Sequence, residues 1–191
     1  MRIITGTARG CRLKTPKGQG TRPTADRVKE SLFNILGSYV VDRKVLDVFA
    51  GTGNLGLEAL SRGAERAVFI DQATASLIRD NAEHTHLLSR SDIRRGDVFR
   101  GLQSLLGSGS RFDLVFCDPP YHKGLWQRAL VFMDTTELLL PGAVVVIEHG
   151  RDENVLPELV RLERIRNQAY GATTQLSIFR MSETDTGGGV S

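Results

Sequence analysis

Apolar and polar residues follow one another in short blocks along the chain, and the period of each block predicts its secondary structure. Brief apolar runs between turn residues predict β-strands, which we place at 44–48, 66–70, 91–95, 112–117, 143–148, 161–169 and 174–181. Apolar residues at helical spacing predict helices at 25–38, 55–62, 73–86, 98–106 and 125–134. Because the first five strands alternate with helices, we expect them to be parallel, with right-handed crossovers.

The last two predicted strands are connected differently. Only a short turn around Tyr170-Gly171-Ala172 separates them, which leaves no room for a crossover helix, so they should pair antiparallel at one edge of the sheet. The pattern therefore predicts an α/β fold with a seven-stranded, mostly parallel sheet and an antiparallel edge pair.

Basic residues are concentrated at the start of the chain. Residues 1–29 carry eight Lys or Arg and one Asp, a net charge of +7, whereas the whole chain carries +3. The segments 2–5 and 11–14 flank a glycine-bearing stretch and predict a β-hairpin. A basic arm on a mildly acidic body favours a polyanionic partner; a solvated basic tail is the alternative. The candidate phosphate contacts are Arg2, Arg9, Arg12, Lys14, Arg22 and Arg27.

Length and composition set the domain organisation. A chain of 191 residues with 40% hydrophobic and 25% charged residues fits one globular domain. We divide it into a basic hairpin arm (1–20), a domain (21–181) and a disordered tail (182–191), and we expect a monomer. No apolar stretch is long enough to span a bilayer. The two cysteines, Cys11 and Cys117, form neither a disulfide framework nor a metal site, which suits the cytoplasm; we expect no metal.

A glycine-rich turn follows the first strand of the domain. Gly51, Gly53 and Gly56 have the spacing G-x-G-x-x-G between a predicted strand and a predicted helix, as in sites for adenosine cofactors. Asp71 ends the next strand, 20 residues after Gly51, where an acidic residue commonly binds ribose hydroxyls. This pattern alone does not separate a nicotinamide dinucleotide from another adenosine cofactor.

Asp47 narrows the choice of cofactor. A carboxylate four residues before Gly51 would repel the pyrophosphate that a dinucleotide places at such a turn, so an oxidoreductase is the weakest alternative. S-adenosylmethionine instead brings an ammonium and a sulfonium group. Asp97, at the end of a later predicted strand, suits an adenine amino group. As alternatives, Asp47 caps a turn or helix, and Asp97 caps the next helix.

The tetrapeptide Asp118-Pro119-Pro120-Tyr121 follows the apolar run 112–117. Two prolines remove two N–H donors, so the tetrapeptide offers a carboxylate and carbonyl acceptors beside an aromatic face. We call these four residues the ledge. A planar amino group fits there, donating to Asp118 and to the Pro119 carbonyl while its ring stacks on Tyr121. The alternative is a loop that ends a strand, with Tyr121 as apolar cover.

Together these motifs resemble the class I S-adenosylmethionine-dependent amino methyltransferases, which have a Rossmann-like fold. More narrowly, the chain resembles the bacterial enzymes that methylate N2 of a guanine in 16S ribosomal RNA. This narrower resemblance covers most of the chain to about residue 180 and rests on the segments 21–24, 27–34 and 56–64. Thr52, Asn54 and Leu55 depart slightly from the expected pattern.

The resemblance implies S-adenosyl-L-methionine as cofactor and 16S rRNA, within the small subunit or an assembly intermediate, as partner. It implies that Asp118 and the Pro119 carbonyl accept the two N–H bonds of guanine N2, while Tyr121 stacks on an unpaired base. The cofactor would contact Asp47, Phe49, Ala50, Gly51, Gly53, Asp71, Gln72, Asp97 and Val98, and the catalytic ledge would comprise Asp118, Pro119, Pro120 and Tyr121.

Other functions use similar motifs. A DNA amino methyltransferase would need a target-recognition domain, and only 70 residues follow Tyr121. A protein glutamine methyltransferase typically has Asn in place of Asp118 and would leave the basic arm unexplained. A non-enzymatic RNA-binding module on the same fold would tolerate the loss of its cofactor residues.

Overall fold

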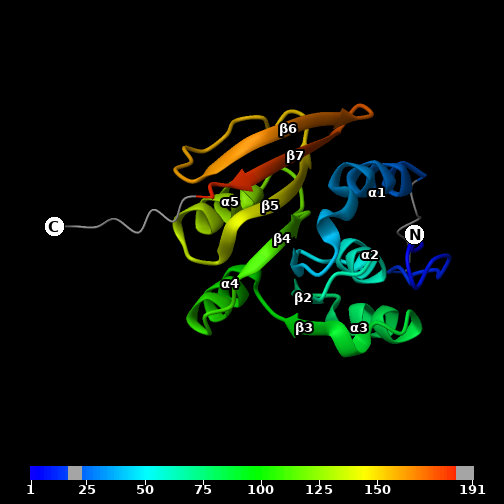
Figure 1. Ribbon diagram of the computed structural model, residues 1–191. Helices are drawn as coiled ribbons and strands as arrows, with labels where there is room; N and C mark the ends of the chain where they lie inside the picture. Colours follow the sequence, from blue (N-terminus) through cyan, green and yellow to red (C-terminus); the bar gives the residue numbers. More distant parts are fainter. Residues whose placement is uncertain (17–22, 184–191) are drawn as a thin grey trace.

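The protein is a three-layer α/β structure, and its computed structural model describes residues 1–16 and 23–183 (Figure 1). Seven strands form one sheet in the order β3-β2-β1-β4-β5-β7-β6. The strands are β1 (Lys44–Val48), β2 (Arg66–Asp71), β3 (Ser91–Arg95), β4 (Phe112–Cys117), β5 (Leu139–Gly150), β6 (Leu162–Tyr170) and β7 (Thr174–Met181). The strands β1 to β5 are parallel, while β7 runs antiparallel between β5 and β6. The predicted topology, including the antiparallel edge pair, is confirmed.

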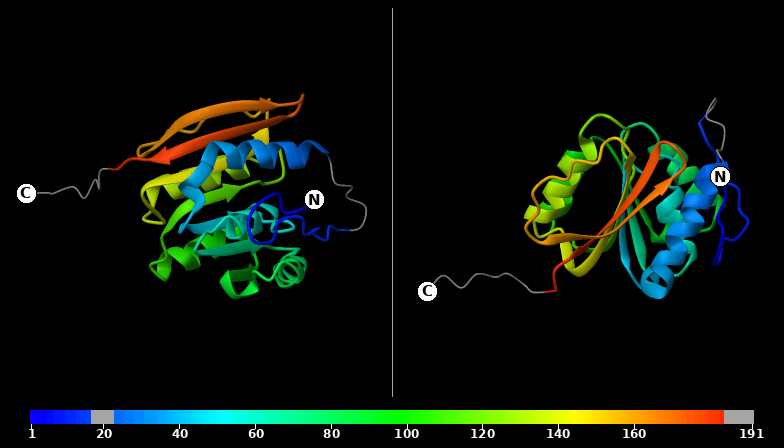
Figure 2. Two further views of the ribbon diagram at one scale, coloured as in Figure 1. Left: turned by 45° about the vertical axis from the view of Figure 1, so that its right-hand side comes forward. Right: turned by 90° about the horizontal axis from the view of Figure 1, so that it is seen from above.

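Helices cover both faces of the sheet. They are α1 (Pro23–Leu36), α2 (Asn54–Ser61), α3 (Ala75–His84), α4 (Val98–Gly107) and α5 (Leu125–Thr135), with short 3-10 helices at Gly37–Val40 and Leu88–Arg90. One apolar cluster joins α1, α2 and α3 to the sheet, and a second joins α4 and α5 to its other face (Figure 2). Central strands buried on both faces need nearly continuous apolar runs, which is why β1 and β4 were recognisable from sequence.

The fifth strand begins earlier than predicted. We expected it at 143–148, but β5 starts at Leu139 and includes Pro141 and Gly142. Its pairing with β4 jumps from Phe112 opposite Leu139 to Leu114 opposite Val144. Such an irregularity accommodates a proline, because the missing N–H falls where the hydrogen-bond ladder is already interrupted.

The N-terminal arm reverses direction as expected but contains little strand. Arg2 and Arg12 form a single antiparallel bridge, and Ile3 N–H donates to the Cys11 carbonyl at 2.9 Å. The arm is packed on the domain rather than free in solvent, since Ile3 and Leu13 are buried in the cluster beneath α1 and α2. The basic residues therefore lie on a folded surface.

The predicted boundaries are partly outside the described residues. Arg22 and the junction at residue 20 fall between residues 16 and 23, and most of the expected disordered tail lies beyond residue 183. The first tail residue is hydrogen-bonded, because Ser182 N–H donates to the Arg161 carbonyl at 3.0 Å.

Candidate functional site

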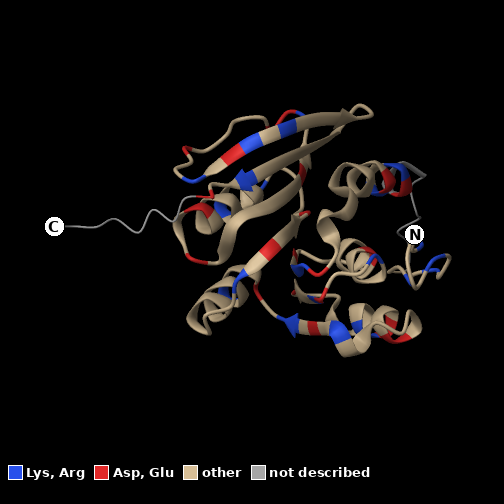
Figure 3. Ribbon diagram, in the orientation of Figure 1, with Lys and Arg blue, Asp and Glu red and all other residues tan. Residues whose placement is uncertain are grey.

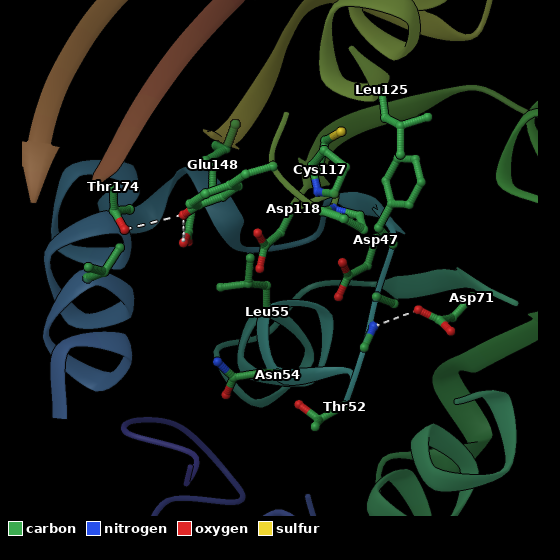
Figure 4. A pocket seen from close by; sticks show the side chains of 18 of the residues that line it. Asp47, Thr52, Asn54, Leu55, Asp71, Cys117, Asp118, Leu125, Glu148 and Thr174 are labelled. Carbon is green, nitrogen blue, oxygen red and sulfur yellow. Dashed lines mark hydrogen bonds between the residues drawn. The ribbon is translucent and has the colours of Figure 1, made fainter. Parts of the chain in front are cut away.

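A cavity of about 1150 Å³ lies at the carboxyl ends of the parallel strands (Figure 4). Open α/β sheets place their ligands at this edge. The cavity exceeds the volume of roughly 300–1,000 Å³ that is usual for one small-molecule site, so it has room for a cofactor and part of a second ligand. The predicted residues that line it are Asp47, Phe49, Ala50, Gly51, Asp71, Gln72, Asp97, Val98, Asp118, Pro119, Pro120 and Tyr121.

The glycine-rich turn connects β1 to α2 in left-handed backbone conformations. Gly51 has a φ of 56° and Gly53 a φ of 78°, values that glycine adopts without steric cost. Gly53 is the exception among the predicted cofactor residues, because it caps α2 and does not line the cavity. A Cβ on Gly56 would lie 2.3 Å from Phe69 Cε1, so glycine permits the close packing of α2 on the sheet.

The carboxylate of Asp71 organises this turn from the end of β2. Asp71 Oδ2 accepts the Gly51 N–H at 3.0 Å, and its Oδ1 accepts the N–H groups of Ala73 and Thr74. Burial raises the pKa of Asp71, but these N–H groups outweigh it and hold the pKa below its ordinary value. Asp71 therefore presents an ionised, pre-oriented carboxylate at the place predicted for the ribose hydroxyls.

Asp47 is buried at the end of β1. Its Oδ2 accepts the Gly56 N–H at 2.9 Å, which is its only hydrogen bond or ion pair among residues 1–16 and 23–183. Burial raises the pKa of Asp47 to about 8, although the Gly56 N–H opposes the rise. An ammonium group beside Asp47 would favour its ionised form.

Asp97 has both of the roles that its sequence position allowed. Its side chain accepts the Arg100 N–H at 3.0 Å and so caps α4, and it also lines the cavity. The Phe99 ring packs edge-on against Phe49, with centroids 6.3 Å apart. This part of the cavity combines apolar walls with a carboxylate acceptor, which suits a heteroaromatic ring bearing an amino group.

Asp118 carries no hydrogen bond or ion pair within the part of the chain that the structure describes. Its side chain faces the cavity and is accessible there, yet protein atoms crowd around it. This desolvation, together with the charges of Glu148 and Asp47, raises the pKa of Asp118 well above its ordinary value. A carboxyl group placed without a donor in such a cleft indicates a functional site.

Tyr121 borders the same part of the cavity with its hydroxyl fixed. The phenol lies 3.0 Å from Glu148 Oε1 and 3.2 Å from Thr174 Oγ1 (Figure 4). Desolvation raises the pKa of the phenol above its ordinary range, so Tyr121 is neutral and donates to Glu148. The aromatic ring is thus held beside Asp118, although its predicted stacking role is not tested by these contacts.

Glu148 and Thr174 were missed by the sequence analysis. Glu148 is the single charged residue in the run Ala143–Glu148, and it ends an apolar stretch just as Asp47, Asp71 and Asp118 do. That shared position was the signal that could have identified it. Thr174 carried no such signal, because β7 approaches the cavity only through its antiparallel pairing with β5.

The predicted phosphate contacts that the structure describes do not line the cavity. Arg2, Arg9, Arg12 and Lys14 are exposed, and the arm that carries them lies next to α2 and α3 (Figure 3). Lys14 Nζ is 3.2 Å from Asp80 of α3. Arg27 lines a separate shallow groove between α1 and β6 together with Arg166.

A buried ion cluster attaches the arm to the domain. Glu58 of α2 is fully buried, and its carboxylate accepts the N–H groups of Ile4 and Thr5 at 2.8 and 3.0 Å. It also forms ion pairs with Lys29 at 3.0 Å and Arg62 at 2.8 Å. Lys29 is itself 1% exposed, and desolvation by burial lowers its pKa although Glu58 opposes this. We call these groups the Glu58 cluster.

The described residues contain no group of three or more His, Cys, Asp or Glu side chains arranged to hold a metal ion. None of the helices in residues 23–183 is long and apolar enough to cross a membrane.

Residues 1–180 match the family model described as "Conserved hypothetical protein 95". The chain belongs to this family. It is 38% identical over 176 residues to "Putative rRNA methyltransferase YlbH" of Bacillus subtilis, covering 91% of this chain and 95% of that protein. It is 35% identical over 165 residues to "Ribosomal RNA small subunit methyltransferase D" of Haemophilus influenzae, covering 82% of each.

A solved structure of a similar protein has the same fold as this chain. "Putative methyltransferase yhhF from Escherichia coli" superposes with a TM-score of 0.81 at 32% identity, covering 96% of this chain and 99% of that one. The resemblance to bacterial small-subunit rRNA methyltransferases and the class I methyltransferase fold are thereby confirmed. The names of these relatives specify no base or atom, so guanine N2 is still a prediction.

Proposed function

We propose that this protein transfers a methyl group from S-adenosyl-L-methionine to the exocyclic N2 of one guanine in 16S rRNA, on an assembling small subunit. One observation carries the proposal: a single cavity joins the glycine-rich turn and its carboxylates to the ledge Asp118–Tyr121. The names of the family relatives support the rRNA substrate.

The residues of the cavity fit this cofactor. Asp71 suits the ribose hydroxyls, and Asp97 with Phe49 and Phe99 suits the adenine ring. Asp47 lies where the ammonium group of the methionine moiety would neutralise it, and no protein cation does so among the described residues. When bound, S-adenosylmethionine supplies an electrophilic methyl group on a sulfonium.

The ledge would act by positioning and electrostatics. The lone pair of guanine N2 is delocalised into the ring, which makes the amine a poor nucleophile. If Asp118 and the Pro119 carbonyl accept its two N–H bonds, they orient the amine and favour a more pyramidal nitrogen. Tyr121 would stack on a base taken out of its helix. No covalent intermediate with the protein is required.

A methyl-transfer assay tests the proposal. Small ribosomal subunits from a strain lacking this protein would be incubated with labelled S-adenosylmethionine and either wild type or Asp118→Ala, followed by nucleoside analysis. We expect N2-methylguanosine in 16S rRNA with the wild type only. Intact cofactor binding without labelled RNA would instead indicate a DNA or protein substrate. Equal rates on naked transcript and assembling particles would exclude the assembly intermediate as the preferred substrate.

A further inference from the structure

Glu148 lies beside Asp118 at the ends of two adjacent parallel strands. The last paired residues of β4 and β5 are Cys117 and Ile147, so Asp118 and Glu148 occupy the next position on each strand. Neighbouring strands of a sheet are about 4.8 Å apart. Figure 4 shows both carboxylates pointing into the cavity, with Asp118 between Glu148 and Asp47.

The two carboxylates share a shortage of hydrogen-bond donors. Glu148 accepts one hydrogen bond, from the Tyr121 phenol, and neither carboxylate forms an ion pair within residues 1–16 and 23–183. Lys29, which also lines the cavity, is already bound to Glu58, to the Arg2 carbonyl and to Asn54. Desolvation by burial raises the pKa of Glu148, and the phenol only partly offsets it. A ligand with two adjacent donors would match this pair.

Guanine has such a pair of donors on one edge. Its N1–H and its N2 amino group are neighbours on the Watson–Crick edge, which proteins read in unpaired bases. An ionised carboxylate only accepts hydrogen bonds. We propose that Glu148 accepts the N1–H of the target guanine and thereby selects guanine over purines whose N1 is an unprotonated acceptor. This inference rests on the proposed function, in which Asp118 accepts from N2.

The selection would act by leaving acceptors unpaired. Adenine and 2,6-diaminopurine carry a lone pair at N1, which would face the Glu148 carboxylate. Two acceptors that face each other, here the purine N1 and the Glu148 carboxylate, weaken binding, because neither regains the hydrogen bond that it lost from water. Sites that hydrogen-bond a substrate group discriminate strongly against analogues that lack it. The base 2,6-diaminopurine isolates this effect, since it keeps the 2-amino group that Asp118 would orient.

The test uses small subunits reconstituted with 16S rRNA that carries guanine or 2,6-diaminopurine at the methylated nucleotide. Methyl transfer to each would be measured as kcat/KM for wild type, Glu148→Gln, Glu148→Asp and the control Glu163→Gln. Glu163 is an exposed residue of β6 that does not line the cavity. We expect the wild type to prefer guanine by about 10- to 100-fold, the range for one specific base contact.

The two substitutions at Glu148 should separate recognition from positioning. Glu148→Gln should reduce the guanine preference at least tenfold, because its amide can donate to an unprotonated N1. Glu148→Asp should slow transfer but keep the preference, because it still only accepts. Glu163→Gln should change neither quantity. Thermal denaturation of each variant would verify folding.

The outcomes distinguish two failures. If Glu148→Gln slows both bases by the same factor, Glu148 only holds the Tyr121 hydroxyl and the inference is wrong. If Glu148→Gln does not fold, loss of the guanine preference in Glu148→Asp would overturn the inference in its place, and its retention would support it. If the wild type methylates neither base although it binds the cofactor, the proposed function itself fails and this inference with it.

Discussion

Two groups of carboxylates in this protein have very different hydrogen-bond and ion-pair partners. In the Glu58 cluster, one carboxylate receives two backbone N–H groups and two side-chain cations. In the cavity, Asp118 receives no hydrogen bond and Glu148 only a phenol, within the residues that the structure describes. The fold alone supplies the partners of the first group, whereas the second group is open to donors from outside the protein.

The comparison predicts which acidic residues are structural and which are functional. A buried charge without a partner reduces stability, and residues that reduce stability persist where function requires them. The Glu58 cluster fixes the basic arm to α2 and therefore determines where its basic residues lie on the surface. The cavity carboxylates do not hold elements together, so their replacement should affect activity more than folding.

Breaking the Glu58 cluster should have the largest effect on stability. Glu58→Ala leaves Lys29 buried without its counter-ion and removes the acceptor for two N–H groups of the arm. We expect a loss of about 3–5 kcal/mol in the free energy of unfolding, measured by urea denaturation. Glu163→Ala on the exposed face of β6 is the matched control, and about 0.5 kcal/mol or less is expected. A similar small loss for Glu58→Ala would contradict the comparison.

Removing the Asp118 carboxylate should reduce activity strongly without reducing stability. Asp118→Ala should lower the rate of methyl transfer by about 10²-fold or more, the usual cost of losing a preorganised electrostatic group. Its free energy of unfolding should stay the same or rise, because a desolvated carboxyl beside Glu148 is gone. Methyl transfer and urea denaturation on the same preparation would measure both. A strongly destabilised Asp118→Ala would assign Asp118 a structural role.

The raised pKa of Asp47 should appear in the pH dependence of stability. Between its ordinary value of 3.8 in the unfolded chain and about 8 in the folded one, the folded state binds more protons. The free energy of unfolding should therefore fall as the pH rises through this interval, by at most about 1.4 kcal/mol per pH unit for this group.

Asp47→Asn tests this assignment without changing the size of the side chain. Urea denaturation from pH 5 to pH 8 should show a weaker decline than in the wild type, and Asp118 would account for part of what is left. An identical decline in both proteins would show that Asp47 ionises at its ordinary pKa. The same variant should bind S-adenosylmethionine more weakly, as measured by calorimetry.

Replacing one basic residue of the exposed arm should have the smallest effect of these changes, and it should act on RNA binding. Arg12→Ala should weaken binding to small-subunit RNA modestly and reduce the slope of log K against log salt by about 1. Folding should be unaffected, because Arg12 is exposed and forms no ion pair among the described residues. Arg66→Ala is the control, because Arg66 begins β2 and so lies at the end of the strands opposite to the cavity. An unchanged slope in Arg12→Ala would remove Arg12 from the RNA-binding surface.

Sequence periodicity was sufficient for most of the fold. The apolar runs of β1, β2 and β4 are short and nearly continuous because both faces are covered, and the turn at Tyr170–Ala172 is too short for anything but an antiparallel connection. Boundaries were less certain. The early start of β5 depends on an irregular pairing with β4, which involves residues far apart in the chain and leaves no local pattern.

The sequence by itself determined the chemistry at the strand ends: Asp47, Asp71, Asp97 and Asp118 each lie near or just after the end of a predicted strand, and a parallel sheet brings such positions to one edge. Only the tertiary structure decided which carboxylates are satisfied. Glu58 gains three of its four partners, Ile4, Thr5 and Lys29, from segments more than 20 residues away in sequence. Glu148 comes beside Asp118 through the pairing of β4 with β5. Hydrogen-bond partners are set by distances in space, which local sequence patterns do not encode.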